Sequence, residues 1–141
     1  MTPSSFAPWL RLSTGAPPDR AVHAGTAHAG AVHVQGRACR SRAGLFSEWA
    51  ARLSLPEYFG RNWDALADSL ADLVAEAPLT VVVDDAVHLL ADEPQAQLRT
   101  LLAVLRGVAT REPDRLVVLL RCAPADEPAL RQRITSAAPP P

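Results

Sequence analysis

Runs of apolar residues predict three β-strands. LTVVV (79–83) and LVVLL (116–120) are uninterrupted, which is typical of strands covered on both faces in a parallel sheet. AVHV (31–34) is the third, and the turn-forming sequence QGR (35–37) ends it. These segments predict the sheet of a small domain.

Apolar positions at helical spacing predict the helices. They are expected at 45–53, 63–73 and 94–110, with a further short helix near 126–134. Pro56 closes the first, because the residue before a proline avoids the helical conformation. Gly60 suits a tight turn, and the Asn62 side chain can accept a free backbone N–H as the N-cap of the second. For the third, Asp92 is expected to act as the cap, with Pro94 in the first turn.

The order of these elements is typical of an α/β fold. Strand, helix, helix, strand, helix and strand in succession favour a small parallel sheet with helices packed on it. The 141 residues fit one such domain. Within residues 1–30 only WLRLS (9–13) alternates like a short strand, and AAPPP (137–141) is expected to fray.

Charge is unevenly distributed along the chain. The formal net charge is only −1, which argues against a nucleic-acid binder. Between residues 57 and 93, however, nine acidic residues face one basic residue, Arg61, so this window carries −8 and the remainder +7. We expect the window to form one acidic face that steers a basic partner. All 14 basic residues are arginine, as in GC-rich genomes such as those of actinobacteria.

Several classes of protein are disfavoured. No apolar run approaches the ~20 residues of a membrane helix. The start of the chain has no secretion signal, so we expect a cytoplasmic protein without a membrane partner. Cys39 and Cys122 lack CxxC spacing and are expected to be reduced thiols. No cofactor motif is found.

Metal binding and catalysis have little support in the sequence. The histidines have five-residue steps that suit neither helix nor strand, so no metal site is expected; they are His23, His28, His33 and, further along, His88. Asp64 and Asp68 could divide general acid and base duties, and the pair Asp84-Asp85 follows a strand end. No nucleophile–base arrangement or phosphate loop accompanies them. We therefore expect a protein that is not an enzyme.

The segment LPEYFGRNWDALADSLADL (55–73) has the composition of a protein interface. Asp64, Asp68 and Asp72 are spaced by four residues, which stacks like charges on one helix face at a cost of roughly 0.2–0.5 kcal/mol per pair. Large aromatic residues precede them, namely Tyr58, Phe59 and Trp63. Aromatic residues around carboxylates are typical of interface hot spots, where apolar contacts exclude water.

LPEYFGRNWDALADSL (55–70) closely resembles the corresponding segment of the barstar family, intracellular inhibitors of barnase-type ribonucleases. The resemblance extends over about 31–122, leaving 1–30 as an N-terminal extension with a candidate added strand and 123–141 as a tail. It implies a small three-stranded parallel sheet packed against three to four helices. It also implies inhibition by occlusion of a nuclease active site.

The resemblance assigns roles to individual residues. Asp68 matches the main inhibitory aspartate and Asp64 its acidic neighbour. Tyr58 matches the aromatic residue that packs on the enzyme, while Gly60 and Asn62 match the close-approach glycine and asparagine. The predicted contact residues are Tyr58, Phe59, Gly60, Asn62, Trp63, Asp64, Ala67 and Asp68.

The chain also departs from the family pattern. Trp63 replaces a leucine, Ala67 replaces a tryptophan, and no acid stands near Gly107 or Val108 where the family has a further glutamate. We expect a monomeric inhibitor of a basic extracellular guanyl-type ribonuclease, with no nucleic-acid partner. Two alternatives stay open: an immunity or protein-binding module for a target that is not a ribonuclease, and, less favoured, a small carboxylate hydrolase.

Overall fold

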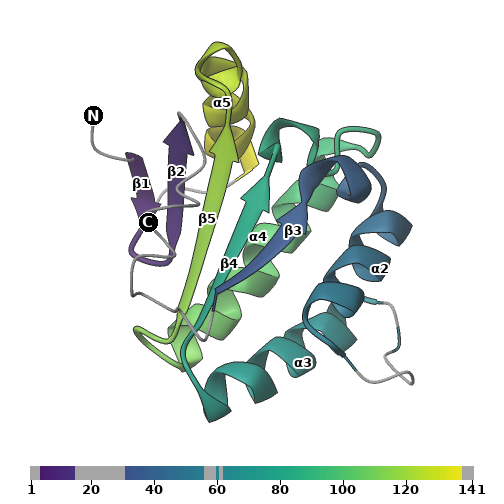
Figure 1. Ribbon diagram of the computed structural model, residues 1–141, viewed down its shortest axis with the longest axis vertical. Helices are drawn as coiled ribbons and strands as arrows, with labels where there is room; N and C mark the ends of the chain where they lie inside the picture. Colours follow the sequence, from purple (N-terminus) through teal and green to yellow (C-terminus); the bar gives the residue numbers. More distant parts are fainter. Residues whose placement is uncertain (1–3, 15–30, 56–59, 61, 138–141) are drawn as a thin grey trace.

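The computed structural model describes residues 4–14, 31–55, 60 and 62–137, with the backbone alone at 4–6. The strands form one five-stranded sheet in the order β1-β2-β5-β4-β3. They are β1 (Ser4–Ala7), β2 (Leu10–Thr14), β3 (Ala31–Gln35), β4 (Leu79–Asp84) and β5 (Leu116–Cys122). Four of them, β2 to β5, are mutually parallel, and β1 adds an antiparallel edge (Figure 1).

The predicted three-stranded sheet is therefore wrong, although the α/β class is confirmed. The fourth parallel strand is β2, which pairs with β5 from Leu10 opposite Val118 to Thr14 opposite Cys122. Leu10 and Leu12 are buried, so the short alternating segment closes what would otherwise be an exposed edge of the sheet. Strand alternation predicts such a segment but does not say which strand it joins.

Four α-helices and three short 3-10 helices complete the described part of the chain. They are η1 (Gly36–Cys39), α2 (Arg42–Arg52), α3 (Trp63–Glu76), η2 (Ala86–His88), α4 (Gln95–Arg111), η3 (Pro124–Asp126) and α5 (Glu127–Ala137). Figure 1 shows α4 running behind the sheet, with α3 along the lower edge of the molecule. None of the helices described is long and apolar enough to cross a membrane.

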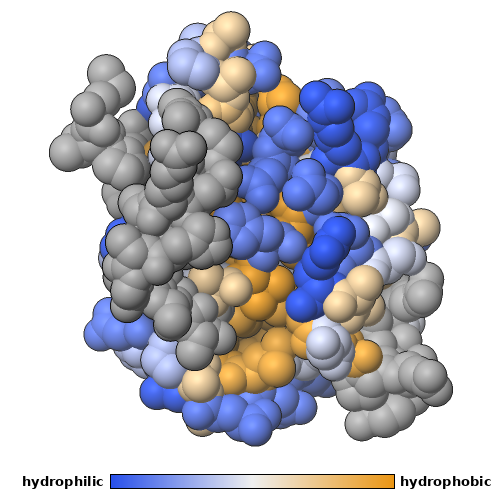
Figure 2. All heavy atoms as spheres, viewed as in Figure 1, coloured by the Kyte–Doolittle hydropathy of each residue, from blue (hydrophilic) through white to orange (hydrophobic). Residues whose placement is uncertain are grey.

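The two faces of the sheet differ in their cover. Toward α4, alternate residues of β4 and β5 such as Val81, Val83 and Val118 are fully buried. On the other face Val117 and Leu119 are only half-buried. Figure 2 shows this face with an apolar patch in its lower half. The uninterrupted apolar runs predicted cover on both faces; no described helix packs on the second face, yet Val82, which alternates with Val81 and Val83, is buried there as well.

Local capping chemistry bounds α2, whereas the predicted cap of α4 is an exception. Ser41 caps α2 by accepting a hydrogen bond from the Gly44 N–H at 3.0 Å. After α2, Ser54 adopts a left-handed backbone (φ 55°), which stops the helix before Pro56. The exception is Asp92, which does not cap α4, because Pro94 holds the N-cap position without a side-chain bond.

The connection from β3 to α2 requires a close approach. A Cβ on Gly36 would lie 2.2 Å from the carbonyl oxygen of Asp85 and 2.6 Å from that of Asp84, so only glycine fits there. Cys39 and Cys122 are both buried and free. Burial raises the pKa of the Cys39 thiol to about 12, so this cysteine is part of the core and not a nucleophile.

Candidate functional site

The start of α3 is fixed by the side chain of Asn62. Its Oδ1 accepts a hydrogen bond from the Ala65 N–H at 2.8 Å, and its Nδ2 donates to the Gly60 carbonyl at 3.1 Å. The prediction that Asn62 caps this helix is confirmed. A Cβ on Gly60 would lie 3.0 Å from Nδ2 of the Asn62 side chain. A larger residue at position 60 would therefore crowd the side chain that caps α3. Asn62 thus joins the turn to the helix.

One face of α3 anchors the helix and the opposite face is acidic. Leu66, Leu70 and Val74 are fully buried. The exposed row at four-residue spacing consists of Asp64, Asp68, Asp72 and Glu76, called here the α3 acidic row. The sequence analysis grouped only Asp64, Asp68 and Asp72 by their spacing. The same four-residue spacing also predicts Glu76 on this face.

The α3 acidic row has no counter-charge among the described residues of the protein. The helix contains no basic residue, and none of the four carboxylates forms an ion pair with any residue that the structure describes. Asp64, in the first turn, benefits from the helix dipole, but Asp72 and Glu76 lie toward its negative end. A row of carboxylates on a capped helix, without ion pairs to the described residues, is suited to binding cations outside the protein.

Trp63 connects this site to the core. It is half-buried, and its ring meets the ring of Phe46 in α2 edge to face, with centroids 5.0 Å apart and an interplanar angle of 68°. The resemblance assigned Trp63 to the contact surface. In the structure it packs against the core and remains only partly buried.

The structure places six of the eight predicted contact residues together. Gly60, Asn62, Trp63, Asp64, Ala67 and Asp68 all lie in the turn before α3 or in its first two turns. Gly60, Asn62, Asp64 and Asp68 are exposed, whereas Trp63 and Ala67 are half-buried. Tyr58 and Phe59 lie outside the described residues.

The other acids of the 57–93 window that the structure describes are bound to partners, whereas Glu57 lies outside the described residues. Asp84 binds the Arg121 guanidinium through one carboxylate oxygen and His33 Nδ1 through the other, the latter at 3.0 Å. Asp85 lies 3.3 Å from Nε of Arg37. Arginines distant in sequence therefore neutralise this part of the window.

Asp92 and Glu93 are bound as well. Arg40 donates two hydrogen bonds to Asp92, at 2.8 and 3.2 Å, and these bonds lower the pKa of the Asp92 carboxyl. Glu93 accepts from the backbone N–H of Arg42 at 2.8 Å. The expected single acidic face is therefore wrong: the free acids of the described chain in this window lie on α3, whereas the paired ones lie around and beyond the carboxyl end of β4 (Figure 1).

Within the described residues, neither Asp64 nor Asp68 is bonded to a side chain that could share catalytic work. No histidine, cysteine, serine or arginine of the described residues forms a hydrogen bond with either carboxylate. Within the described ranges, no group of three or more histidines, cysteines or acids could hold a metal ion. His33 and His88 instead contact Asp84 and Arg40, and His23 and His28 lie outside the described residues.

Comparison with known protein families gives a match over most of the folded part of the chain. The model of the family described as "Barstar (barnase inhibitor)" matches residues 29–121, which is more than half of the chain. The matched region runs from just before β3 almost to the end of β5 and includes α2, α3 and α4; β1, β2 and α5 lie outside it. Among curated proteins, no sequence matches this chain.

Proposed function

The chain belongs to the barstar family, and from that premise we propose that it inhibits a secreted guanyl-type ribonuclease by covering the active site of the enzyme. The inhibitory surface in this proposal is the first half of α3 with the turn before it. The observation that carries the proposal is the α3 acidic row, which is exposed, held by a capped helix and free of ion pairs with the described residues.

The proposed mechanism is replacement of the RNA phosphate. A ribonuclease of this type holds a phosphate between cationic side chains. A carboxylate presents two oxygens that accept charge-assisted hydrogen bonds from the same donors. We assign the main role to Asp68 and a supporting role to Asp64, because both project from the first two turns of a helix fixed by Asn62 and the buried Leu66.

The proposed contact area is smaller than the family pattern implies. The α4 sequence QAQLRTLLAVLRGVATR contains no acid, and at the positions where a further glutamate would be expected Gly107 is exposed and Val108 is buried. Ala67, half-buried between Asp64 and Asp68, offers little area to a partner. We infer that α3 carries most of the charge complementarity.

Inhibitors act by occlusion and not by turnover, so the proposal includes no catalytic step. We propose that the protein works as a cytoplasmic monomer that protects its producer from a basic enzyme made for export. The departures at Ala67 and Gly107 favour one second candidate, an immunity module whose target is a basic protein other than a ribonuclease.

The test is a stoichiometric titration. The purified protein is added to a microbial guanyl-type ribonuclease, and RNA cleavage is followed. The proposal predicts a linear loss of activity that ends near equimolar inhibitor. Asp68→Asn should shift the curve to much higher concentration, whereas the matched change Asp72→Asn should not. Binding to the enzyme with full residual cleavage would exclude occlusion, and no binding to any member of a panel of such enzymes would favour the second candidate.

A further inference from the structure

The N-terminal hairpin builds a pocket against α4. The cavity has a volume of about 720 Å³ and lies between the β1–β2 turn, the C-terminal half of α4 and the start of β5. One wall, Ala7 to Arg11, lies outside the part of the chain that the family model matches, and the opposite wall lies within it. The added hairpin therefore gives this domain a feature that residues 29–121 do not form alone.

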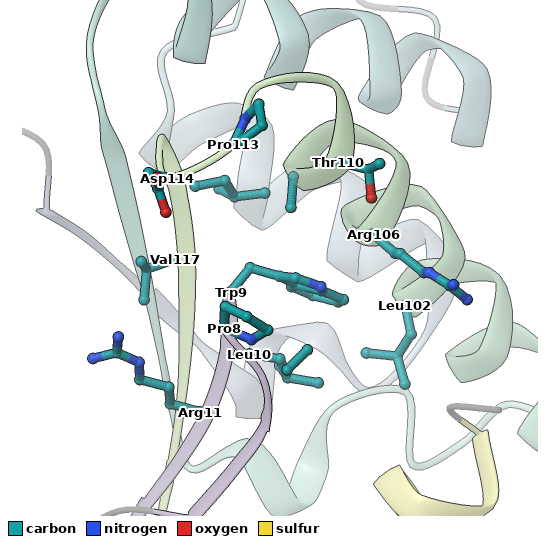
Figure 3. A pocket seen from close by; sticks show the side chains of 13 residues that line it. Pro8, Trp9, Leu10, Arg11, Leu102, Arg106, Thr110, Pro113, Asp114 and Val117 are labelled. Carbon is teal, nitrogen blue, oxygen red and sulfur yellow. The ribbon is translucent and has the colours of Figure 1, made fainter. Parts of the chain in front are cut away.

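Strand register explains why the pocket is open. β2 begins with Leu10 opposite Val118, so Leu116 and Val117 at the start of β5 have no β2 neighbour. The Val118 N–H donates to the Trp9 carbonyl at 2.7 Å, which holds Trp9 at the point where the two strands separate. Figure 3 shows the Trp9 ring directed toward Leu102 of α4 across this gap.

The pocket joins an aromatic surface to one arginine. Trp9 is half-buried and presents its ring toward Thr110 and Arg106 (Figure 3). Arg106 lines the cavity and forms no ion pair or hydrogen bond with the described residues. Arg11 also lines it, but its side chain is directed away from the Trp9 ring, and Asp114 lies on the side opposite Arg106 (Figure 3). The charge beside the aromatic ring is therefore that of Arg106.

This chemistry specifies a class of ligand. Pockets of ~300–1,000 Å³ with apolar walls and a few polar groups are typical of small-molecule sites. The indole ring offers a stacking surface to a flat aromatic system. Because Arg106 has no partner among the residues that the structure describes, it can turn toward an anionic group on the ligand. Asp114 on the opposite side disfavours a ligand with several negative charges.

We propose that the cavity between Trp9 and Arg106 binds a small, flat aromatic molecule that bears one negative group. The site is separate from the α3 acidic row, since no residue of that row lines the cavity. Its ligand is attracted by positive charge, whereas the proposed partner of α3 is attracted by negative charge. The two sites therefore select different molecules.

Two fluorescent probes test this proposal on the full chain. Anilinonaphthalene sulfonate has flat rings and one negative group, and phenyl-naphthylamine has the same rings without the charge. We expect saturable one-to-one binding of the sulfonate to the folded protein, with unchanged near-ultraviolet circular dichroism. At saturation, the backbone amide signals of Leu10 and Thr110 should shift in a two-dimensional nuclear magnetic resonance spectrum.

Charge variants on one helix decide the role of Arg106. Arg106→Gln should lower the affinity for the sulfonate roughly fivefold, as expected for loss of one partly exposed ion pair. The affinity for the neutral probe should stay within about twofold of wild type. The matched control Arg99→Gln removes the same charge from an exposed position of α4 outside the cavity, and it should leave both probes unchanged. No saturable binding, equal effects of the two variants, or unshifted Leu10 and Thr110 amides would overturn the proposal.

Discussion

The ring of Trp63 meets the ring of Phe46 edge to face, with the two centroids 5.0 Å apart. This contact joins the first residue of α3 to the middle of α2, so the acidic helix is positioned by the core and not only by its own turn. Phe46 is buried, whereas Trp63 is half-buried. Under the proposed function, Trp63 therefore serves both the stability of the protein and the binding of its partner.

Trp63→Ala should reduce both the stability of the protein and its binding to the proposed partner. The free energy of unfolding should fall by about 2 kcal/mol, less than the ~3–5 kcal/mol typical of a fully buried aromatic residue. Trp63→Leu, which restores an apolar side chain, should recover most of that stability. Urea denaturation measures the loss. An unfolding free energy unchanged in Trp63→Ala would show that the contact with Phe46 does not hold α3.

Asn62 should contribute through its cap. Asn62→Ala removes the acceptor for the Ala65 N–H, and we expect a loss of ~1 kcal/mol in unfolding free energy. Asn62→Asp keeps an acceptor at the same position and should be close to wild type. Thermal and urea denaturation of the two variants provide the comparison, and equal losses in both would contradict the capping role.

The start of α3 could be predicted because its signals are local. An asparagine one residue before an apolar helical pattern is sufficient to place the N-cap, and the four-residue spacing of Asp64 and Asp68 is sufficient to place both on one face. The position of β2 could not be predicted in this way. Its partner β5 lies more than a hundred residues away, and alternation alone does not identify a partner strand.

The ion pairs of the acidic residues could not be predicted from the sequence either. Counting acids along the sequence assigned Asp84 and Asp92 to one acidic face together with α3. Their partners, Arg121 and Arg40, are 37 and 52 residues away, and only the fold brings them together. Asp92, expected to cap α4, lies two residues before the N-cap Pro94, and its carboxylate binds Arg40.

The two central aspartates of the α3 acidic row should differ in their effect on binding. Asp68→Ala should cost ~2–5 kcal/mol of binding to the ribonuclease, because it leaves buried cations of the enzyme without a counter-charge. Asp72→Ala, one turn further along, should cost less than ~1 kcal/mol, as rim charges do. Both variants should fold as stably as wild type. Calorimetric titration gives the affinities, and equal losses would contradict the assigned geometry.

Association should depend strongly on salt. The free carboxylates of α3 attract a basic enzyme over about a Debye length, ~10 Å at 0.1 M salt, so the association rate should fall steeply as salt rises while dissociation changes little. The double variant Asp72→Asn with Glu76→Gln should lower the association rate and leave the dissociation rate near wild type. Stopped-flow association rates that are flat across salt concentrations would remove electrostatic steering from the mechanism.

Competition with a nucleotide tests most directly whether α3 takes the place of RNA phosphate. A guanyl-type ribonuclease is mixed with the product analogue 3′-GMP at concentrations from zero to saturation. The affinity of the inhibitor for the enzyme is measured by calorimetry at each nucleotide concentration. Occlusion predicts an apparent Kd that rises in proportion to the nucleotide concentration, because the two ligands exclude each other. Asp68→Asn should weaken binding most in the absence of nucleotide. An apparent Kd independent of 3′-GMP would contradict the account, because the protein would then bind the enzyme away from its active site.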